Sequence, residues 1–319
     1  MNSIRFVKAK SATFVGPGKL KVVNGRLSFA TKHGNALRLD FKSLKEVTCI
    51  GKVGLTDRAI DAILGRGIVV IFLNEHGTSV RGQLGHDNGA RLMLRRRQWN
   101  TYNSPQSRRQ LAIEIIVAKI ESMKAASRHF QKQSIGQFQS LRKYSGLQRR
   151  VNKAQKINEA MGLEGQASRI WFNDFGSAIP APFSFSKRTK RPPKDPVNSL
   201  LSLGYTFLLR RIVSQVLAKG FEVELGMLHE IRTGRPSLAC DLIEPLRALV
   251  VDRWVVRLLR KRSVALSDFE TVDQGKVVLK KKSFPLVLKS LEKQLASKQK
   301  KIAKELDLFQ NRIEEIDSN

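Results

Sequence analysis

The chain has 319 residues, which exceeds the usual size of one hydrophobic core and predicts two domains. Hydrophobic residues make up 41% of the sequence, and the longest uninterrupted apolar run, residues 68–73, is far shorter than the roughly 20 residues that span a bilayer. We therefore expect a soluble cytoplasmic protein without membrane association. Lysine and arginine number 58 against 27 acidic residues, a net charge of +31 that predicts DNA or RNA as partner and leaves an anionic membrane surface as the weaker alternative.

Short apolar runs separated by turn-forming residues dominate the first 85 residues. Strands are expected over residues 20–23, 27–30, 36–39 and 47–50, with a turn at Asn24-Gly25, and this pattern predicts an antiparallel sheet. A helix over residues 56–64 follows, because Thr56 is a good cap, and strands are expected over residues 68–73 and 80–83. The turn-rich segment 85–89 marks the boundary of a small β-rich N-terminal domain, residues 1–85.

Helical periodicity dominates residues 86–319. Helix signals begin at Arg108, breaks are expected at Ser145-Gly146 and at Gly162, and residues 184–195 form a basic linker that contains prolines. A long helix is predicted from Asp195-Pro196 to Gly220, and another from Pro236-Ser237 past Leu258. The lysine-rich tail, residues 276–304, is expected to be a basic surface helix. The predicted fold class is therefore α+β, a small β-rich domain followed by a larger all-α domain.

Two isolated residues are candidates for metal binding. Glu164 lies between glycines in the segment 161–171, where a carboxylate is able to hold a hard cation but more often complements a helix dipole. His229 follows a helix stop among apolar residues, where a histidine is more often structural than a metal ligand. Neither residue alone decides between the two interpretations.

The pair Asp241 and Glu244 is a stronger candidate. A spacing of three places both carboxylates on one face of a helix whose other residues are largely apolar. Burial and mutual repulsion would raise a pKa unless a cation lies near them, and Pro245 loosens the helix because it has no amide hydrogen. A metal ion and an ion pair with Arg247 or Arg253 remain equally good interpretations on chemistry alone.

Four ordered stretches resemble the CRISPR-associated protein one family, the integrases of CRISPR adaptation. They are LEGQASRIWFNDF at residues 163–175, PFSFSKRTKRPPKDPVNSLLSLGYTFLLRRIV at residues 182–213, LGMLHE around His229 and SLACDLIEPLR at residues 237–247. In the N-terminal part, GLTDRAI at residues 54–60 precedes GIVVIFLNEHG at residues 67–77 in the same manner. The resemblance covers about residues 20–260.

The resemblance implies a fold, a site and a reaction. A β-rich N-terminal domain would dimerise and contact DNA, and the helical domain would carry Mg²⁺ or Mn²⁺ on Glu164, His229 and Glu244, with Asp241 as a supporting acid. The 3′-hydroxyl of a prespacer fragment would attack a phosphodiester at the repeat and leader by transesterification. The expected partners are DNA, a second copy of the chain and the second CRISPR adaptation protein. Backbone contacts to DNA are expected from basic residues of the linker and of the acidic motif, namely Arg188, Lys190, Arg191, Lys194 and Arg247.

Alternatives remain open at this point. A transposon-type integrase or a branched-DNA nuclease would keep the same fold, and a non-catalytic nucleic-acid-binding protein would keep only the charge. The tail at residues 276–304 matches no motif of the family. Subtype, spacer length, repeat sequence and preferred metal are not predicted.

Overall fold

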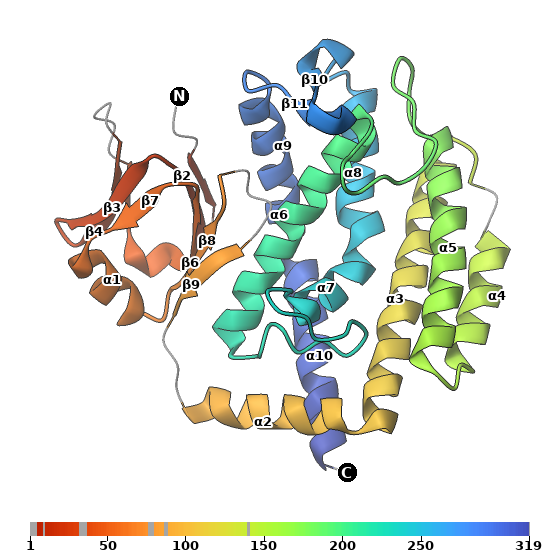
Figure 1. The fold of residues 1–319 in the computed structure, drawn as a ribbon, viewed down its shortest axis with the longest axis horizontal. Helices are drawn as coiled ribbons and strands as arrows, with labels where there is room; N and C mark the ends of the chain where they lie inside the picture. Colours follow the sequence, from red (N-terminus) through yellow and green to blue (C-terminus); the bar gives the residue numbers. More distant parts are fainter. Residues whose placement is uncertain are drawn as a thin grey trace. The chain divides into compact units, whose positions relative to one another are not determined.

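The computed structural model describes residues 5–8, 10–31, 37–75, 80–85, 89–138 and 141–318 (Figure 1). The chain forms two compact units. A β-rich unit contains Met1–Gln98 and Arg210–Val223, and a larger, mostly helical unit contains Trp99–Leu209 and Glu224–Asn319. The helix α6 (Pro196–Lys219) contributes residues to both units.

The β-rich unit contains two sheets among its described residues. One has the order β1 (Arg5–Lys8), β2 (Lys10–Val15), β6 (Leu44–Ile50), β8 (Val69–Leu73) and β9 (Val80–Leu84), and the other has the order β5 (Leu37–Leu39), β4 (Arg26–Ala30), β3 (Gly18–Val23) and β7 (Val53–Leu55). The prediction of an antiparallel sheet was wrong in part, because β2, β6 and β8 run parallel, as do β3 and β7. Long crossovers through the other sheet and through α1 permit this parallel pairing.

Local signals in the β-rich unit gave correct predictions. Asn24 and Gly25 have φ of 50° and 71°, the left-handed pair that a tight hairpin turn between β3 and β4 requires. The predicted helix is α1 (Asp57–Leu64), where the Thr56 hydroxyl accepts a hydrogen bond from the Ala59 amide at 3.3 Å. A short 3₁₀ turn, Phe41–Ser43, precedes β6. The buried side chains of α1 join the core of both sheets.

Long helices form the first half of the larger unit. They are α2 (Gly89–Asn103), which begins in the other unit, α3 (Pro105–Lys132), α4 (Leu141–Asn152) and α5 (Ile157–Ser177). The predicted breaks at Ser145-Gly146 and Gly162 were wrong, because these residues lie inside α4 and α5. A glycine costs only about 1 kcal/mol in a helix interior, and the buried Tyr144 and Leu147 anchor α4 in the core.

The helix α6 begins and ends where the sequence predicts. The Asp195 carboxylate accepts a hydrogen bond from the Asn198 amide at 2.8 Å, and Gly220 ends the helix with a φ of 96°. Residues Pro196–Leu217 are long and apolar enough to cross a membrane by length and composition, contrary to the prediction from uninterrupted apolar runs. Since 67% of the most apolar window is buried inside the structure, the apolar character of α6 is that of a core helix.

The predicted helix from Pro236-Ser237 past Leu258 changes geometry along its length. It consists of α7 (Ser237–Ile243), a 3₁₀ turn (Glu244–Leu246), a π-helical segment (Arg247–Asp252) and α8 (Arg253–Arg260). The change begins next to Pro245, as expected for a residue that donates no amide hydrogen bond. The side chains that follow Glu244 therefore point in other directions than they would in a regular α-helix.

The tail differs from the predicted surface helix. Its first residues form β11 (Lys276–Leu279), which pairs in a hairpin with β10 (Phe269–Val272), so the larger unit is not entirely helical. The short turn Leu266–Asp268 precedes β10, and Asp273–Gly275 connects the two strands. The helices α9 (Phe284–Ser297) and α10 (Gln299–Ser318) follow. Leu288, Leu291 and Leu295 are completely buried, and the Trp254 indole of α8 donates to the Ser290 hydroxyl at 3.1 Å. Apolar residues at helical spacing thus make α9 part of the core.

Candidate active site

A polar pocket of about 600 Å³ lies within the larger unit. Side chains from α3, α5, the linker after α5, α6, the segment before α7 and the irregular helix after α7 line it. Its charged and hydroxyl-bearing residues include Lys119, Glu164, Ser168, Arg188, Lys190, Tyr205, His229, Glu244, Arg247 and Asp252. The structure therefore brings Glu164, His229 and Glu244 to one cavity from three separate parts of the sequence.

Lys119 joins the two glutamates of this pocket. Its ammonium donates to Oε1 of Glu164 and lies 2.6 Å from Oε2 of Glu244. The Ser168 hydroxyl, one turn after Glu164 on α5, also donates to Oε1 at 2.6 Å. Glu164 lies about two turns inside α5, so it does not serve the helix dipole as a residue of the first turn would.

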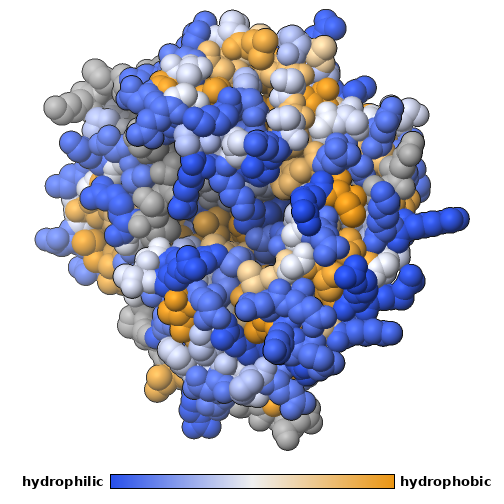
Figure 2. All heavy atoms as spheres, turned by 45° about the vertical axis from the view of Figure 1, so that its right-hand side comes forward, coloured by the Kyte–Doolittle hydropathy of each residue, from blue (hydrophilic) through white to orange (hydrophobic). Residues whose placement is uncertain are grey.

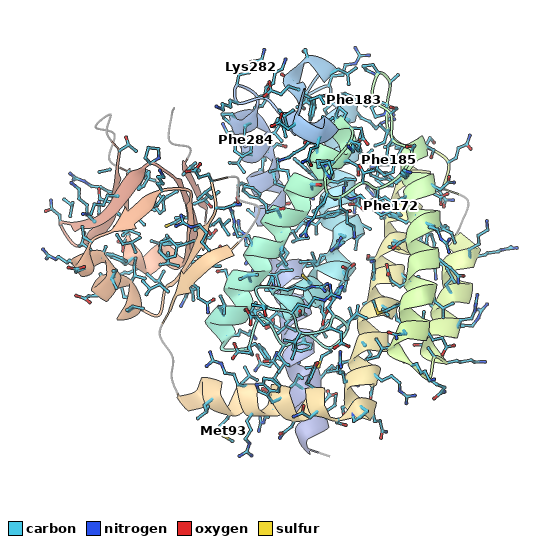
Figure 3. All side chains as sticks on the ribbon, viewed as in Figure 1. Met93, Phe172, Phe183, Phe185, Lys282 and Phe284 are labelled. Carbon is cyan, nitrogen blue, oxygen red and sulfur yellow. The ribbon has the colours of Figure 1, made fainter. Side chains whose placement is uncertain are left out.

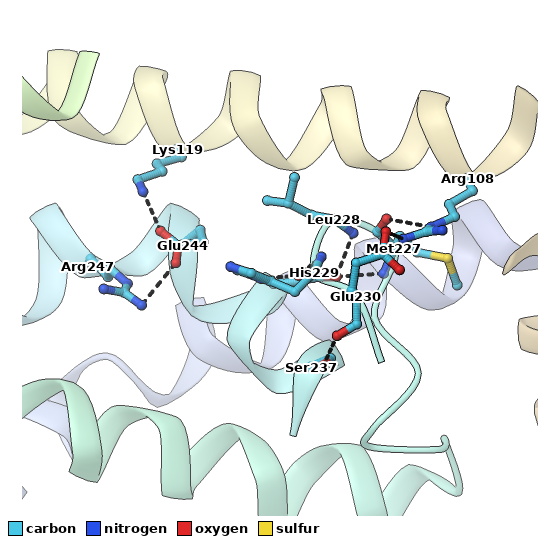
Figure 4. A network of polar contacts seen from close by, with 10 residues as sticks. Arg108, Lys119, Met227, Leu228, His229, Glu230, Ser237, Glu244 and Arg247 are labelled. Atoms are coloured by element: carbon cyan, nitrogen blue, oxygen red, sulfur yellow. Dashed lines mark hydrogen bonds and ion pairs between the residues drawn. The ribbon is translucent and has the colours of Figure 1, made fainter. Parts of the chain in front are cut away.

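Glu244 is held as a buried anion (Figure 4). Its Oε1 forms an ion pair with the Arg247 guanidinium at 2.9 Å, and its side chain is only 6% exposed. Burial raises the pKa of such a carboxyl group, but the charges of Arg247 and Lys119 outweigh burial and hold the pKa of Glu244 at about 2. The ion pair with Arg247, one of the two interpretations left open by the sequence, is therefore present.

Asp241 fixes the position of His229. Its Oδ2 accepts from the backbone amides of Met227 and Leu228 at 2.6 and 2.9 Å, and its Oδ1 accepts from the His229 amide at 3.1 Å and lies 2.6 Å from His229 Nδ1. Burial raises the pKa of Asp241, while the imidazole and the amides act in the opposite direction. A Cβ atom on Gly226 would lie 2.8 Å from Oδ2, so this turn needs glycine.

The contact with Asp241 decides which nitrogen of His229 remains available. A carboxylate only accepts hydrogen bonds, so Nδ1 carries a hydrogen, and Nε2 is the ring nitrogen left to bind a metal ion. The free edge of the ring points toward Glu244 in Figure 4. A carboxylate that orients an imidazole in this way is typical of histidines that bind metal ions.

An aromatic and acidic cluster forms the wall behind Arg247. Asp252 accepts hydrogen bonds from the Tyr205 hydroxyl and, at 2.7 Å, from the Trp171 indole. The guanidinium of Arg247 lies over the Tyr205 ring at 4.7 Å from its centroid. Burial raises the pKa of Asp252 to about 6, although these hydrogen bonds oppose the shift. Burial also raises the pKa of Tyr205.

The raised pKa of Asp252 predicts a pH dependence of stability. Between the ordinary value of 3.8 and about 6 the folded chain binds more protons than the unfolded chain, so its stability falls as the pH rises through this window. Asp252→Asn removes the titration. We expect the melting temperature of the wild type, relative to this variant, to be roughly 2–4 °C higher at pH 5 than at pH 7. A difference that does not change with pH, measured by calorimetry at both values, contradicts the assignment.

The predicted DNA-binding residues separate into two groups. Arg188, Lys190 and Arg247 line the pocket, whereas Arg191 and Lys194 do not. The Lys194 ammonium instead donates to the Gln274 carbonyl at 2.6 Å and so connects the linker to the hairpin of β10 and β11. Arg191 is exposed. The structure therefore brings three of the five cations to the site.

Two polar residues of α6, Asn198 and Ser202, hold the Arg188 side chain in its position at the pocket. Arg188 donates to Oδ1 of Asn198 at 2.8 Å and to the Ser202 hydroxyl at 3.0 Å. Aromatic packing holds the linker on α5, since the ring of Phe185 lies 5.8 Å from that of Phe172 (Figure 3). Gly204 permits close approach of α6 to the π-helical segment, because a Cβ atom at Gly204 would lie 2.4 Å from a methyl group of Val251.

Sequence reasoning missed Lys119, Tyr205 and Asp252 as site residues. Lys119 had a visible signal, since it stands in the apolar run from Ile115 to Ile120, where a lysine is expensive to bury without a partner. Tyr205 appeared in the motif of α6, but no pattern gave it a role. Asp252 had no visible signal. It lies in the π-helical segment, whose residues do not follow the α-helical spacing from which its position relative to Glu244 would be predicted.

The donor set fits a hard divalent cation. The two carboxylates already share one positive charge, and the buried Oε2 of Glu244 contacts only the Lys119 ammonium among the groups that the structure describes. Oxygen ligands with one imidazole suit Mg²⁺ or Mn²⁺. As the side chains stand, Lys119 contacts both glutamates, and no three acidic, histidine or cysteine groups in the described ranges lie close enough together to hold one ion.

The sequence matches one known protein family over most of its length. The family described as "CRISPR associated protein Cas1" matches residues 14–293. A relative from Thermus thermophilus named CRISPR-associated endonuclease Cas1 3 is 32% identical over 253 residues, which are 79% of this chain and 74% of the relative. One from Thermodesulfovibrio yellowstonii named CRISPR-associated endonuclease Cas1 1 is 32% identical over 289 residues, 84% of this chain and 86% of the relative.

Solved structures share the fold at lower identity. A CAS1 protein from Thermotoga maritima has a TM-score of 0.81 at 23% identity and covers 95% of this chain and 97% of its own. A casposase bound to an integration product has a TM-score of 0.76 at 20% identity and covers 91% of this chain and 83% of its own. The predicted fold class, β-rich followed by helical, is confirmed. On the family match and the identities, the chain belongs to the Cas1 family of CRISPR-associated endonucleases.

Proposed function

We propose that this chain is a divalent-metal-dependent DNA integrase of CRISPR adaptation, which inserts prespacer DNA into the repeat array through the pocket around Glu164 and Glu244. One observation carries the proposal: two glutamates share a single cation position in a pocket that is also lined by His229 and by five further lysine and arginine side chains. Carboxylates suit a metal ion, and a cationic wall suits a phosphodiester.

Glu164, Glu244 and Nε2 of His229 would hold Mg²⁺ or Mn²⁺, and Asp241 positions the histidine without binding the ion itself. Such an ion, when bound, supplies Lewis-acid stabilisation of charge on a phosphate oxygen. The buried amide contacts of Asp241 make the imidazole rigid, and rigidity keeps Nε2 aimed at the pocket. The identity of the metal is part of the proposal.

The cationic side chains would orient the DNA for reaction. Arg247 and Arg188 flank the ring of Tyr205, at 4.7 and 5.4 Å from its centroid, so their guanidinium planes have fixed positions. Burial and the charge of Arg247 lower the pKa of Lys190, as expected where like charges crowd one pocket. These groups would hold the phosphate under attack by a 3′-hydroxyl and offset the charge that develops on its oxygens.

The partners proposed are DNA, a second copy of the chain and the second adaptation protein. Structural neighbours with the same fold include a Cas6-RT-Cas1–Cas2 complex, with a TM-score of 0.77, and a Cas1–DNA complex, with a TM-score of 0.56. The net charge of +31 supports DNA binding independently of these neighbours. We assign dimerisation and part of the DNA contact to residues 1–85, catalysis to residues 86–319, and the site of action to the cytoplasm.

A strand-transfer assay tests the proposal. A duplex fragment with 3′-hydroxyl ends and a labelled repeat with its leader are incubated with the protein and its second adaptation protein, with Mg²⁺, with Mn²⁺ or with a chelator. We expect joined product only when metal is present. Equal product with the chelator, or none under any of these conditions, overturns the proposal.

A transposon-type integrase is the second candidate, because the casposase shares the fold over 91% of this chain. The same assay separates the two functions. Insertion at the border between leader and repeat supports CRISPR adaptation, whereas insertion at target DNA without a repeat supports the transposon function.

Lys119 gives a further prediction for the site. Its ammonium contacts the carboxylate oxygens that a divalent ion would need, so the lysine and the ion compete. We expect Lys119→Met to bind Mn²⁺ about tenfold more tightly at pH 8, equivalent to about 1.4 kcal/mol. Lys124→Met on the same helix is the control, because Lys124 pairs only with Glu121 among its described neighbours, at 3.8 Å. Electron paramagnetic resonance of free Mn²⁺ measures both; unchanged or weaker binding by Lys119→Met contradicts the competition.

A further inference from the structure

A second basic surface lies between α4 and α5. A groove of about 570 Å³ there is lined by Lys143, Arg149, Arg150 and Lys153, together with Gln166 and Ile170 of α5. The four cations are exposed, and none of them pairs with a carboxylate in the part of the chain that the structure describes. No acidic residue appears in the lining. A concave surface with four unneutralised positive charges attracts a polyanion.

The sequence of α4 builds this surface along one face. Lys143 and Arg150 lie two turns apart on α4 with Gly146 between them, and Lys153 directly follows the end of the helix. Tyr144, Leu147 and Val151 are buried and hold the helix on its neighbours. A Cβ atom on Gly146 would meet nothing within 4 Å, so the middle of the groove is open down to the backbone. A phosphate group is able to approach the helix closely at this point.

The helix α5 separates the groove from the candidate active site. Gln166 and Ile170, one turn apart, line the groove, whereas Glu164 and Ser168 line the pocket that contains Lys119. Since a helix with its side chains is about 10 Å across, the groove lies about that far from the pocket. A DNA strand in a duplex covers this distance in about three nucleotides. Hydrophilic side chains dominate the surface that Figure 2 turns forward.

We propose that the groove between α4 and α5 is a second DNA site, which binds the phosphate backbone of duplex DNA about three nucleotides from the phosphate in the active site. It rests on the proposed function for the location of the reacting phosphate, but not for binding itself. Lysine and arginine contacts to phosphates carry no base information, so the groove would accept any sequence. Its role would be to fix the direction in which the duplex leaves the active site.

The test compares two variants that lose the same charge. The groove variant is Lys143→Gln, Arg149→Gln, Arg150→Gln and Lys153→Gln, and the control is Lys281→Gln, Lys282→Gln, Lys289→Gln and Lys293→Gln, four exposed lysines of the tail. The Kd of each for a duplex is measured without metal over a range of salt concentrations. Each lost phosphate contact lowers the slope of log K against log salt by about 0.9.

We expect the groove variant to lose between about two and about four contacts, so that the slope falls by roughly 2–4, and to bind at least tenfold more weakly at physiological salt. The control should lose less than half as much slope. Equal losses in the two variants show that only net charge matters and overturn the proposal, as does an unchanged slope in the groove variant. The binding comparison is made without metal and does not depend on catalysis. Failure of strand transfer by the wild type would therefore contradict the proposed function but not the test of the groove.

Discussion

Glu244→Gln is expected to reduce strand transfer by about 10² to 10³-fold, the largest single loss in the molecule. The substitution keeps the size of the side chain but removes the charge that Lys119 and Arg247 face at 2.6 and 2.9 Å. It would also remove a proposed metal ligand, so Mn²⁺ binding should weaken in parallel. Two half-buried cations lose the partner that they share, and we expect a loss of about 3 kcal/mol in the free energy of unfolding.

Glu121→Gln is the matched control for this variant. Glu121 also faces two cations, Lys124 at 3.8 Å and Arg128 at 3.5 Å, but its side chain is 49% exposed, so its ion pairs contribute little. We expect this control to keep activity and stability. Single-turnover strand transfer, Mn²⁺ titration and urea unfolding measure the three effects. If Glu244→Gln stays within tenfold of the wild type in strand transfer, Glu244 is not a ligand of the reacting metal.

The second large effect is expected from Asp241→Asn. Asp241 accepts from three backbone amides and the His229 ring, and an asparagine would turn an NH₂ group toward some of these donors. We expect a loss of about 3 kcal/mol in the free energy of unfolding and a 10 to 100-fold loss in Mn²⁺ affinity, since the imidazole loses its fixed orientation. Asp241 would then be a positioning residue rather than a ligand.

The pattern of losses distinguishes that role from a purely structural one. A merely structural change would lower the melting temperature without moving the Mn²⁺ affinity of the remaining folded protein. Asp195→Asn is the control, because asparagine caps a helix as well as aspartate does, and the cap of α6 should survive. An Asp241→Asn protein that is destabilised but binds Mn²⁺ with wild-type affinity excludes the positioning role.

Sequence reasoning succeeded where the signal was local. The start of α6 at Asp195-Pro196 and its end at Gly220 follow from capping chemistry within a few residues. The change of helical geometry beside Pro245 follows from one missing amide hydrogen. The structure also places Glu164, His229 and Glu244, the residues that the family motifs indicate, around one pocket, while metal binding by them stays a prediction.

The remaining features depend on contacts between distant segments. Parallel pairing of β2, β6 and β8 is set by crossovers that no strand pattern contains. Gly146 and Gly162 look like helix breakers, but buried neighbours on α4 and α5 outweigh their low helix propensity. Lys119 gains its importance only when α3, α5 and the segment after α7 pack together. No local pattern predicts that meeting.

The 28 residues of α3 run without interruption from Pro105 to Lys132, with Lys119 near the middle. A helix turns by about 100° for each residue, so one residue inserted or deleted between Pro105 and Lys119 would rotate the ammonium away from both carboxylates. Substitutions on the exposed face leave this angular position unchanged. Evolution is therefore free to vary the exposed residues of this helix but not the number of residues that precede Lys119 in it, and insertions should accumulate in the connections that flank the helix.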